Sequence, residues 1–177
     1  MYLFLDCEFN GWHDQGTGDL ISLGLVSIDG KYEFYEVVNC KSPSPFVVQH
    51  VLPKLGQSAI PMWELVKKLC NFLWEVNSQE EDHITIVADY PSDIELFNRI
   101  LLLGQGQCIN VPVLGFLLDL SLTTKNSMIP HNALADARAL SIDYALKHAH
   151  KVLSLCKKNR LNLSRRVVAV HFLNYAV

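Results

Sequence analysis

The chain has 177 residues, of which 50% are hydrophobic and 19% are charged. These values fit one globular domain with a sizeable core and exclude an intrinsically disordered chain. No apolar run reaches the roughly 18 residues of a membrane span, the N-terminus lacks the features of a secretory signal, and the cysteines form no CxxC pair. We therefore expect a cytoplasmic protein with free thiols and no membrane association.

Three strands are predicted first, as a meander; they cover Tyr2–Cys7, Leu20–Ile28 and Lys31–Val38. Helices and strands then alternate, which predicts an α/β fold with a mixed central sheet flanked by helices. The later elements are a short helix at Val47–Leu55, a helix at Pro61–Val76 with Trp63 and Trp74 expected in the core, a strand at Ile84–Ala88, a helix at Asp93–Leu103, an apolar segment at Pro112–Leu122 that fits strand or helix, and a long helix from about His131 to about Cys156.

The net charge of −3 hides a strong asymmetry along the chain. Residues 147–177 carry seven Lys or Arg and no acidic residue, whereas residues 1–146 carry eight Lys or Arg against all eighteen Asp and Glu. An acidic body does not suit long-range capture of a polyanion, but it suits a site where carboxylates surround metal cations. The basic end either contacts phosphates or is a solvated end of the chain, and both interpretations stay open.

Two carboxylates lie at the end of the first predicted strand. Residues two apart in a strand point to the same face, so Asp6 and Glu8 project together while Cys7 points away. Such a pair repels unless a cation lies between the two groups, and hard oxygen ligands suit Mg²⁺ or Mn²⁺. Taken alone, the D-x-E pattern is more often a polar strand exit than a metal site.

Two further positions carry acidic residues at the start of predicted helices. Asp93 opens the helix after the fourth strand, where an N-cap is the simpler interpretation, and Asp89 at the strand end competes with it. His131 and Asp136 stand five apart, with His131 expected in the loop that enters the last helix and Asp136 in the helix itself. A lone His–Asp pair at a helix start more often caps the helix or faces solvent.

The combination is more specific than its parts, and it resembles the DEDDh 3′–5′ exonuclease superfamily, which contains proofreading subunits, RNase T and oligoribonuclease. Asp6 and Glu8 match the first motif, and the segment from His131 to Leu140 is close to the "H-x-A-L-x-D-A" helix. Asp89 to Asp93 matches the spacing of the N-A-x-F-D motif, with Ser92 in place of Phe. The resemblance covers about residues 1–150, which we treat as one exonuclease domain, and it implies an RNase H-like fold.

The resemblance also implies a mechanism. Two Mg²⁺ or Mn²⁺ ions would be held by Asp6, Glu8, Asp93 and Asp136, with Asp6 shared by both ions and Asp93 acting mainly through bound water. His131 would be the general base. The substrates would be the 3′ ends of single-stranded RNA or DNA, and the products nucleoside 5′-monophosphates. We predict Asp93, rather than Asp89, as the carboxylate of the second motif.

Three residues after the first motif, Phe9, Asn10 and Trp12, are candidates for contact with the terminal nucleotide, although the two aromatics fit packing roles equally well. The segments Leu20–Val38 and Val51–Leu55 resemble a branch of small bacterial exoribonucleases, which favours RNA slightly. Residues 151–177 lie outside the resemblance; their apolar end predicts packing on the domain or on a second subunit in a homodimer.

Three alternatives remain open at this point. One is a DNA-directed exonuclease of proofreading or repair type. Another is a catalytically silent nucleic-acid-binding module on the same fold, which the presence of all five motif residues disfavours. The last is an unrelated α/β interaction protein in which the motifs are coincidental.

Overall fold

The computed structural model describes residues 1–11, 18–80, 83–102 and 107–149. The chain forms two compact units, Met1–Asp143 and Tyr144–Val177, and every candidate site residue discussed below belongs to the first. The predictions for Trp12 and for residues 151–177, including the second subunit, fall outside the described residues. In the part of the chain that is described, no helix combines the length and the apolar character needed to cross a membrane.

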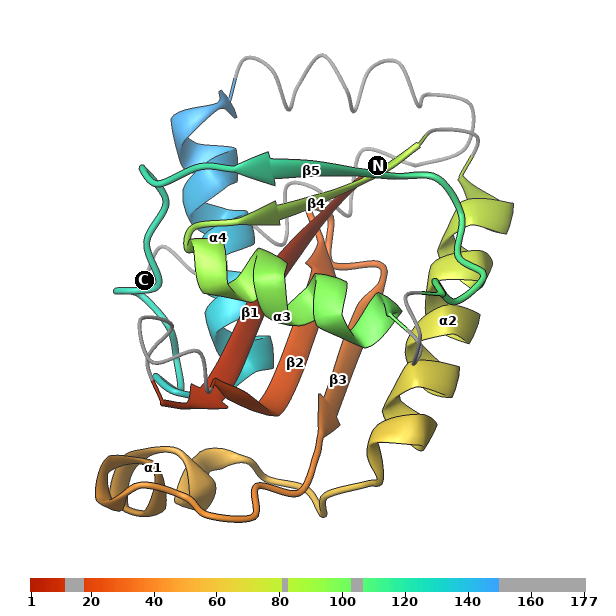
Figure 1. The fold of residues 1–177 in the computed structure, drawn as a ribbon. Coiled ribbons are helices and arrows are strands. Elements are labelled where there is room, and N and C mark those ends of the chain that lie inside the picture. Colours follow the sequence, from red (N-terminus) through yellow and green to blue (C-terminus); the bar gives the residue numbers. More distant parts are fainter. Residues whose placement is uncertain (12–17, 81–82, 103–106, 150–177) are drawn as a thin grey trace. The chain divides into compact units, whose positions relative to one another are not determined.

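A five-stranded mixed sheet forms the centre of the first unit (Figure 1). The first three strands make the predicted antiparallel meander, and β4 and β5 add to β1 in parallel. The resulting order, β3-β2-β1-β4-β5, confirms the predicted RNase H-like α/β arrangement. The strands are β1 (Tyr2–Asn10), β2 (Asp19–Ser27), β3 (Glu33–Val37), β4 (Ile84–Ala88) and β5 (Leu114–Leu118).

The helices follow the predicted order with shifted boundaries. The short helix expected after β3 is divided in two, because Pro53 lacks an N–H and lies in the first turn of a separate 3₁₀ helix. The ambiguous apolar segment contains strand β5. The helices are α1 (Pro45–His50), the 3₁₀ helix η2 (Leu52–Lys54), α2 (Met62–Gln79), α3 (Pro91–Leu101) and α4 (Ala133–Lys147).

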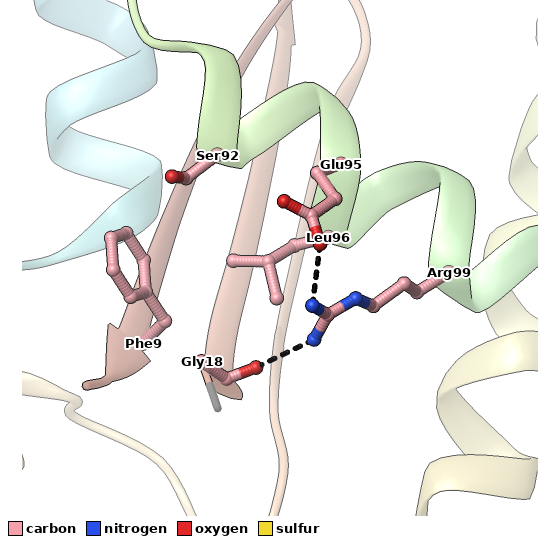
Figure 2. A pocket seen from close by; sticks show the side chains of 6 residues that line it. All are labelled: Phe9, Gly18, Ser92, Glu95, Leu96 and Arg99. Atoms are coloured by element: carbon pink, nitrogen blue, oxygen red, sulfur yellow. Dashed lines mark hydrogen bonds and ion pairs between the residues drawn. The ribbon is translucent and has the colours of Figure 1, made fainter. Parts of the chain in front are cut away.

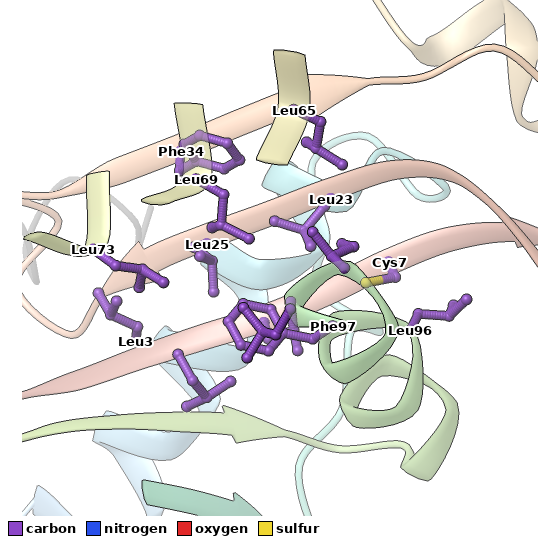
Figure 3. Close-up of a cluster of buried hydrophobic side chains, with 14 of the residues drawn as sticks. Leu3, Cys7, Leu23, Leu25, Phe34, Leu65, Leu69, Leu73, Leu96 and Phe97 are labelled. Carbon is purple, nitrogen blue, oxygen red and sulfur yellow. The ribbon is translucent and has the colours of Figure 1, made fainter. Parts of the chain in front are cut away.

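One face of the sheet packs against α2 and α3 in the main hydrophobic core (Figure 3). This core joins alternate residues of the strands with the apolar stripe of α2; its members include Leu3, Leu5, Cys7, Leu23, Leu25, Leu65, Leu69, Leu73 and Phe97. Trp63 and Trp74 lie beside that stripe and are 67% and 40% exposed, so their expected core positions are wrong. The indole of Trp74 instead donates to the carbonyl of Asn110 at 3.0 Å.

The opposite face of β1 carries the acidic residues, and the first turn of α4 lies directly against the neighbouring strand there. Asp6 pairs with Gly24 of β2. A Cβ atom on Gly24 would stand 2.4 Å from the carbonyl carbon and oxygen of Ala133, the first residue of α4. Only a glycine permits this contact, and the contact brings the start of α4 over the carboxylates of β1.

We predict that Gly24→Ala both destabilises the fold and disturbs the acidic face. The new methyl group has to displace the backbone of α4, and overpacking of this kind costs roughly 1–3 kcal/mol. Urea unfolding measures the loss. Gly115→Ala is the matched control, because its Cβ would make an ordinary 3.4 Å contact with the Thr85 hydroxyl. Equal stabilities of the two variants would contradict this account of Gly24.

Candidate functional site

Strand β1 places Asp6 and Glu8 side by side on the face toward α4. The strand continues past both residues to Asn10, so they lie inside a paired strand rather than at its exit as the sequence suggests. Glu8 is buried, and the Oδ2 oxygen of Asp6 is buried without a hydrogen-bond partner among the described residues. A buried carboxylate oxygen that lacks a donor is unfavourable unless a cation or water meets it.

Helix α3 contributes Asp93 from its first turn. The helix begins at Pro91 with Tyr90 as its N-cap, so Asp93 does not cap the helix as the simpler interpretation supposes. Its Oδ1 instead accepts a hydrogen bond from the backbone N–H of Cys7 at 3.1 Å. This bond ties α3 to β1 between the two acidic residues of the first motif.

The loop before α4 contributes His131, and α4 contributes Asp136. His131 lies outside the helix, as predicted, with a left-handed backbone (φ 67°), and its N–H donates to Oδ2 of Asp136 at 2.9 Å. Its ring nitrogen Nδ1 stands 3.8 Å from Oε2 of Glu8. The expected base and two expected metal ligands are therefore brought together.

Asn132 holds this loop in place. Its Oδ1 caps α4 by accepting from the N–H of Ala135 (3.1 Å), and its Nδ2 donates to the Tyr35 hydroxyl (3.0 Å) and the Lys54 carbonyl (2.9 Å). The Nζ of Lys54 in turn donates to the carbonyl of Pro130 at 2.8 Å. These bonds connect the loop to β3 and η2, and they support the unusual backbone of His131.

The carboxylates form two groups that share Asp6. One oxygen each from Asp6, Glu8 and Asp136 lie within 4.8 Å of one another, and so do oxygens of Asp6, Asp89 and Asp93. Each group could hold a metal ion with the hard oxygen ligands that Mg²⁺ and Mn²⁺ prefer. Asp89 thus belongs to the same group as Asp6 and Asp93, and the choice of Asp93 rather than Asp89 as the carboxylate of the second motif stays a prediction.

The cluster is electrostatically strained. Burial raises the pKa of Asp6 well above its usual range, and the neighbouring Asp93 and Glu8 raise it further. Burial also raises the pKa of Glu8 to about 8, with Asp136 and Asp93 adding to the rise and Lys54 acting against it. The pKa of Asp93 rises to about 8 through burial and the charge of Asp89. Bound cations would relieve this strain.

Other chemistry at the site is disfavoured. Burial raises the pKa of the Cys7 thiol, and the charge of Asp93 raises it further, so this cysteine is a poor nucleophile. Its side chain points into the hydrophobic core (Figure 3). The site therefore offers carboxylate oxygens and one imidazole.

A cavity of about 300 Å³ opens beside the cluster. Its walls combine carboxylates with aromatic and hydroxyl groups; they are Asp6, Cys7, Phe9, Asp89, Tyr90, Asp93 and Thr124. Phe9 also lines a second hollow of only about 10 Å³, where Arg99 of α3 donates to the Gly18 carbonyl at 3.0 Å and pairs with Glu95 (Figure 2). That hollow has room for a single water, so the larger cavity is the better ligand site.

The residues predicted to contact the substrate have different roles in the structure. Phe9 lines the cavity while also packing against the core. Asn10 uses its amide to hold the chain before α1, accepting from the N–H of Ser44 (2.9 Å) and donating to the carbonyl of Ser42 (2.8 Å). Tyr90 and Thr124, which sequence reasoning did not select, line the same cavity as Phe9.

No protein-family model matches the chain, and no curated protein matches it.

We predict that the metal-free protein loses stability as the pH rises from about 5 to about 9. Glu8 and Asp93 have folded-state pKa values of about 8, above the usual carboxyl range. The folded chain therefore keeps protons that the unfolded chain has released, and this stabilising contribution, complete below the unfolded pKa, disappears as the pH passes the folded pKa. Mg²⁺ or Mn²⁺ should restore stability at high pH by binding the ionised cluster.

Thermal melts in EDTA and in Mn²⁺ across this pH range measure the effect. Asp6→Asn should flatten the pH dependence and weaken the response to Mn²⁺, whereas Glu75→Gln, on an exposed part of α2, should change neither. A metal-free melting temperature that increases with pH would contradict the prediction.

Proposed function

We propose that this chain is a two-metal-ion 3′–5′ exonuclease of the DEDDh type, releasing nucleoside 5′-monophosphates from single-stranded nucleic acid, with RNA slightly favoured. The observation that carries the proposal is the pair of carboxylate groups that share Asp6, with His131 standing 3.8 Å from Glu8. These are the residues matched by the superfamily's motifs, and they come from three distant segments of the chain. The RNase H-like sheet order supports the same proposal.

The residues suit phosphodiester hydrolysis. Two Mg²⁺ or Mn²⁺ ions held by the carboxylates would stabilise the charge that develops on the phosphate and on the departing 3′ oxygen. His131 is 42% exposed at its side chain, so water can reach the imidazole, which accepts the proton of the attacking water. The hydrogen bond from the His131 N–H to Asp136 keeps the ring beside the cluster.

The cavity supports action at a strand end. Its volume of about 300 Å³ lies at the lower limit of the range of small-molecule sites, which suits one nucleotide rather than a longer segment. Phe9 and Tyr90 offer aromatic surface for a base beside the carboxylates that would hold the phosphate.

We predict divalent-metal-dependent 3′–5′ exonuclease activity that EDTA abolishes and that Asp6→Asn reduces almost to nothing. Asp6 belongs to both carboxylate groups, so its loss affects both ion sites, while the relief of like-charge repulsion leaves the fold intact or more stable. Digestion of 5′-labelled single-stranded RNA and DNA, side by side, measures activity and substrate preference, with Glu75→Gln as control. Wild-type turnover by Asp6→Asn would refute the assignment; a ladder on DNA alone would favour the DNA-directed alternative.

We predict that His131 acts as the general base rather than as a metal ligand. His131→Asn is the preferred variant, because asparagine tolerates the left-handed backbone at this position better than alanine does. The variant should lose about 10²–10⁴-fold in kcat while keeping its affinity for Mn²⁺. Isothermal titration calorimetry, run beside the kinetics, would contradict the role if metal affinity disappeared together with activity.

A further inference from the structure

The ring of His131 is held less firmly than its backbone. The backbone N–H donates to Asp136, and the hydrogen bonds of Asn132 fix the residue that follows. The imidazole itself is 42% exposed, and its Nδ1 stands 3.8 Å from Oε2 of Glu8, which exceeds the length of a hydrogen bond. Within the part of the chain that the structure describes, no hydrogen bond fixes the direction of this ring. A general base needs a fixed direction, because proton transfer depends on the geometry between the base and the proton that it takes.

An aromatic side chain meets the imidazole. The ring of Phe46, from helix α1, lies edge to face with the ring of His131, with centroids 5.5 Å apart and an angle of 89° between the planes. Aromatic pairs prefer such T-shaped arrangements, which stabilise the pair beyond the burial of its surface. The ring of His50, four residues later on α1, lies 4.7 Å from the ring of Phe46. Neighbours at this spacing on a helix support one another, so Phe46 is itself held in place.

The helix that carries Phe46 is firmly anchored. Val47 and Val51 are buried in a second hydrophobic cluster with Ile21 and Val37 of the sheet. The N-cap Ser44 accepts from the N–H of Val47, and its own N–H donates to Asn10 at the end of β1. The ring of Phe46 therefore has a fixed position relative to the strand that carries the first two carboxylates.

The packing of α1 does not explain why an aromatic residue stands at position 46. Phe46 is 54% exposed, whereas the apolar contacts that hold α1 on the sheet come from Val47 and Val51. Single exposed aromatics are common on protein surfaces, but this one touches the expected base. Its replacement should leave α1 folded, so an effect on the reaction can be measured apart from an effect on the fold.

We propose that Phe46 is a positioning residue for His131. Its ring holds the imidazole in the orientation that turns Nδ1 toward Glu8 and leaves Nε2 to accept the proton of the attacking water. This inference rests on the proposed exonuclease function, in which His131 is the general base, and it adds a residue that acts through that base without touching the substrate.

Steady-state kinetics on a 5′-labelled single-stranded oligonucleotide with Mn²⁺ test the role. Phe46→Leu keeps the apolar bulk and removes the ring, so kcat should fall about three- to tenfold, the factor that corresponds to the loss of an aromatic pair. KM should stay unchanged. Phe46→Tyr keeps the ring and should restore kcat, and Val48→Ala, at a position 51% exposed on the same helix, should alter neither constant. A raised KM with unchanged kcat would show that Phe46 binds the substrate instead, which overturns the proposal.

A double-mutant cycle tests whether Phe46 acts through His131. In a His131→Asn background the ring that Phe46 holds is absent, so Phe46→Leu should cause no further loss of kcat. A loss of the same factor in both backgrounds would overturn the proposal, because Phe46 would then act on some other group.

Proton NMR of the imidazoles gives a readout that does not depend on activity. The His131 ring signals, assigned by their absence in His131→Asn, should move in Phe46→Leu at constant pH and return toward their wild-type positions in Phe46→Tyr. The signals of His83, which is exposed at the start of β4, should stay in place. Unmoved His131 signals in Phe46→Leu would refute the contact.

The outcomes separate this inference from the proposed function. A wild-type protein without nuclease activity refutes the exonuclease proposal, whatever the NMR signals show. A wild-type protein that is active, together with a Phe46→Leu variant of unchanged kcat, refutes the role of Phe46 and leaves the exonuclease proposal standing.

Discussion

The close approach of α4 to β2 at Gly24 is the contact on which the rest of the acidic site depends. The pleat of β1 fixes Asp6 and Glu8, but their carboxylate group also requires Asp136, which belongs to a segment about 130 residues later. The side chain of Asp136 reaches them because the backbone of Ala133 lies where a Cβ of Gly24 would be. The charges of the carboxylates oppose this arrangement, since the ionised groups repel one another. Backbone packing imposes it.

Hydrogen bonds from backbone N–H groups then orient the carboxylates that packing brings together. The N–H of Cys7 holds Asp93, and the N–H of His131 holds Asp136, so two of the carboxylates have one oxygen engaged by the protein. Asn132 connects the loop of His131 to Tyr35 and Lys54, outside the acidic cluster. A cluster fixed in this way would need little rearrangement to bind a cation, which favours affinity because less ordering would accompany binding.

The sequence predicts the strands of this fold well, because their apolar and β-branched residues follow simple patterns; Ile84–Ala88 has the predicted bounds. It also predicts the residues that meet at the site, because few acidic residues of the chain match the spacing of the three motifs. Contacts between distant segments cannot be predicted from the local sequence. The residues around Gly24 do not indicate its contact with Ala133, and the residues around Phe46 do not indicate its contact with His131. The spacing of Trp63 and Trp74 fits one helix face, but Leu65, Leu69 and Leu73 define the face that is buried. The position of Asp89 depends on how β4 ends beside β1, which the local sequence does not indicate.

If the chain hydrolyses nucleic acid as proposed, its charge distribution makes cation binding a condition for substrate binding rather than a later addition. The described site gathers five carboxylates, and the residues up to 146 are acidic in sum. A polyanion is repelled by such a site, and Lys54 with its single charge cannot neutralise it. The raised pKa values express the same repulsion within the protein, because protonation is the alternative to a bound cation. Divalent ions would remove both obstacles together, because they would replace the protons on the carboxylates and present positive charge to the phosphate of the proposed substrate. For the proposed exonuclease reaction, the electrostatics of the site thus favour ions that enter before or together with the strand end.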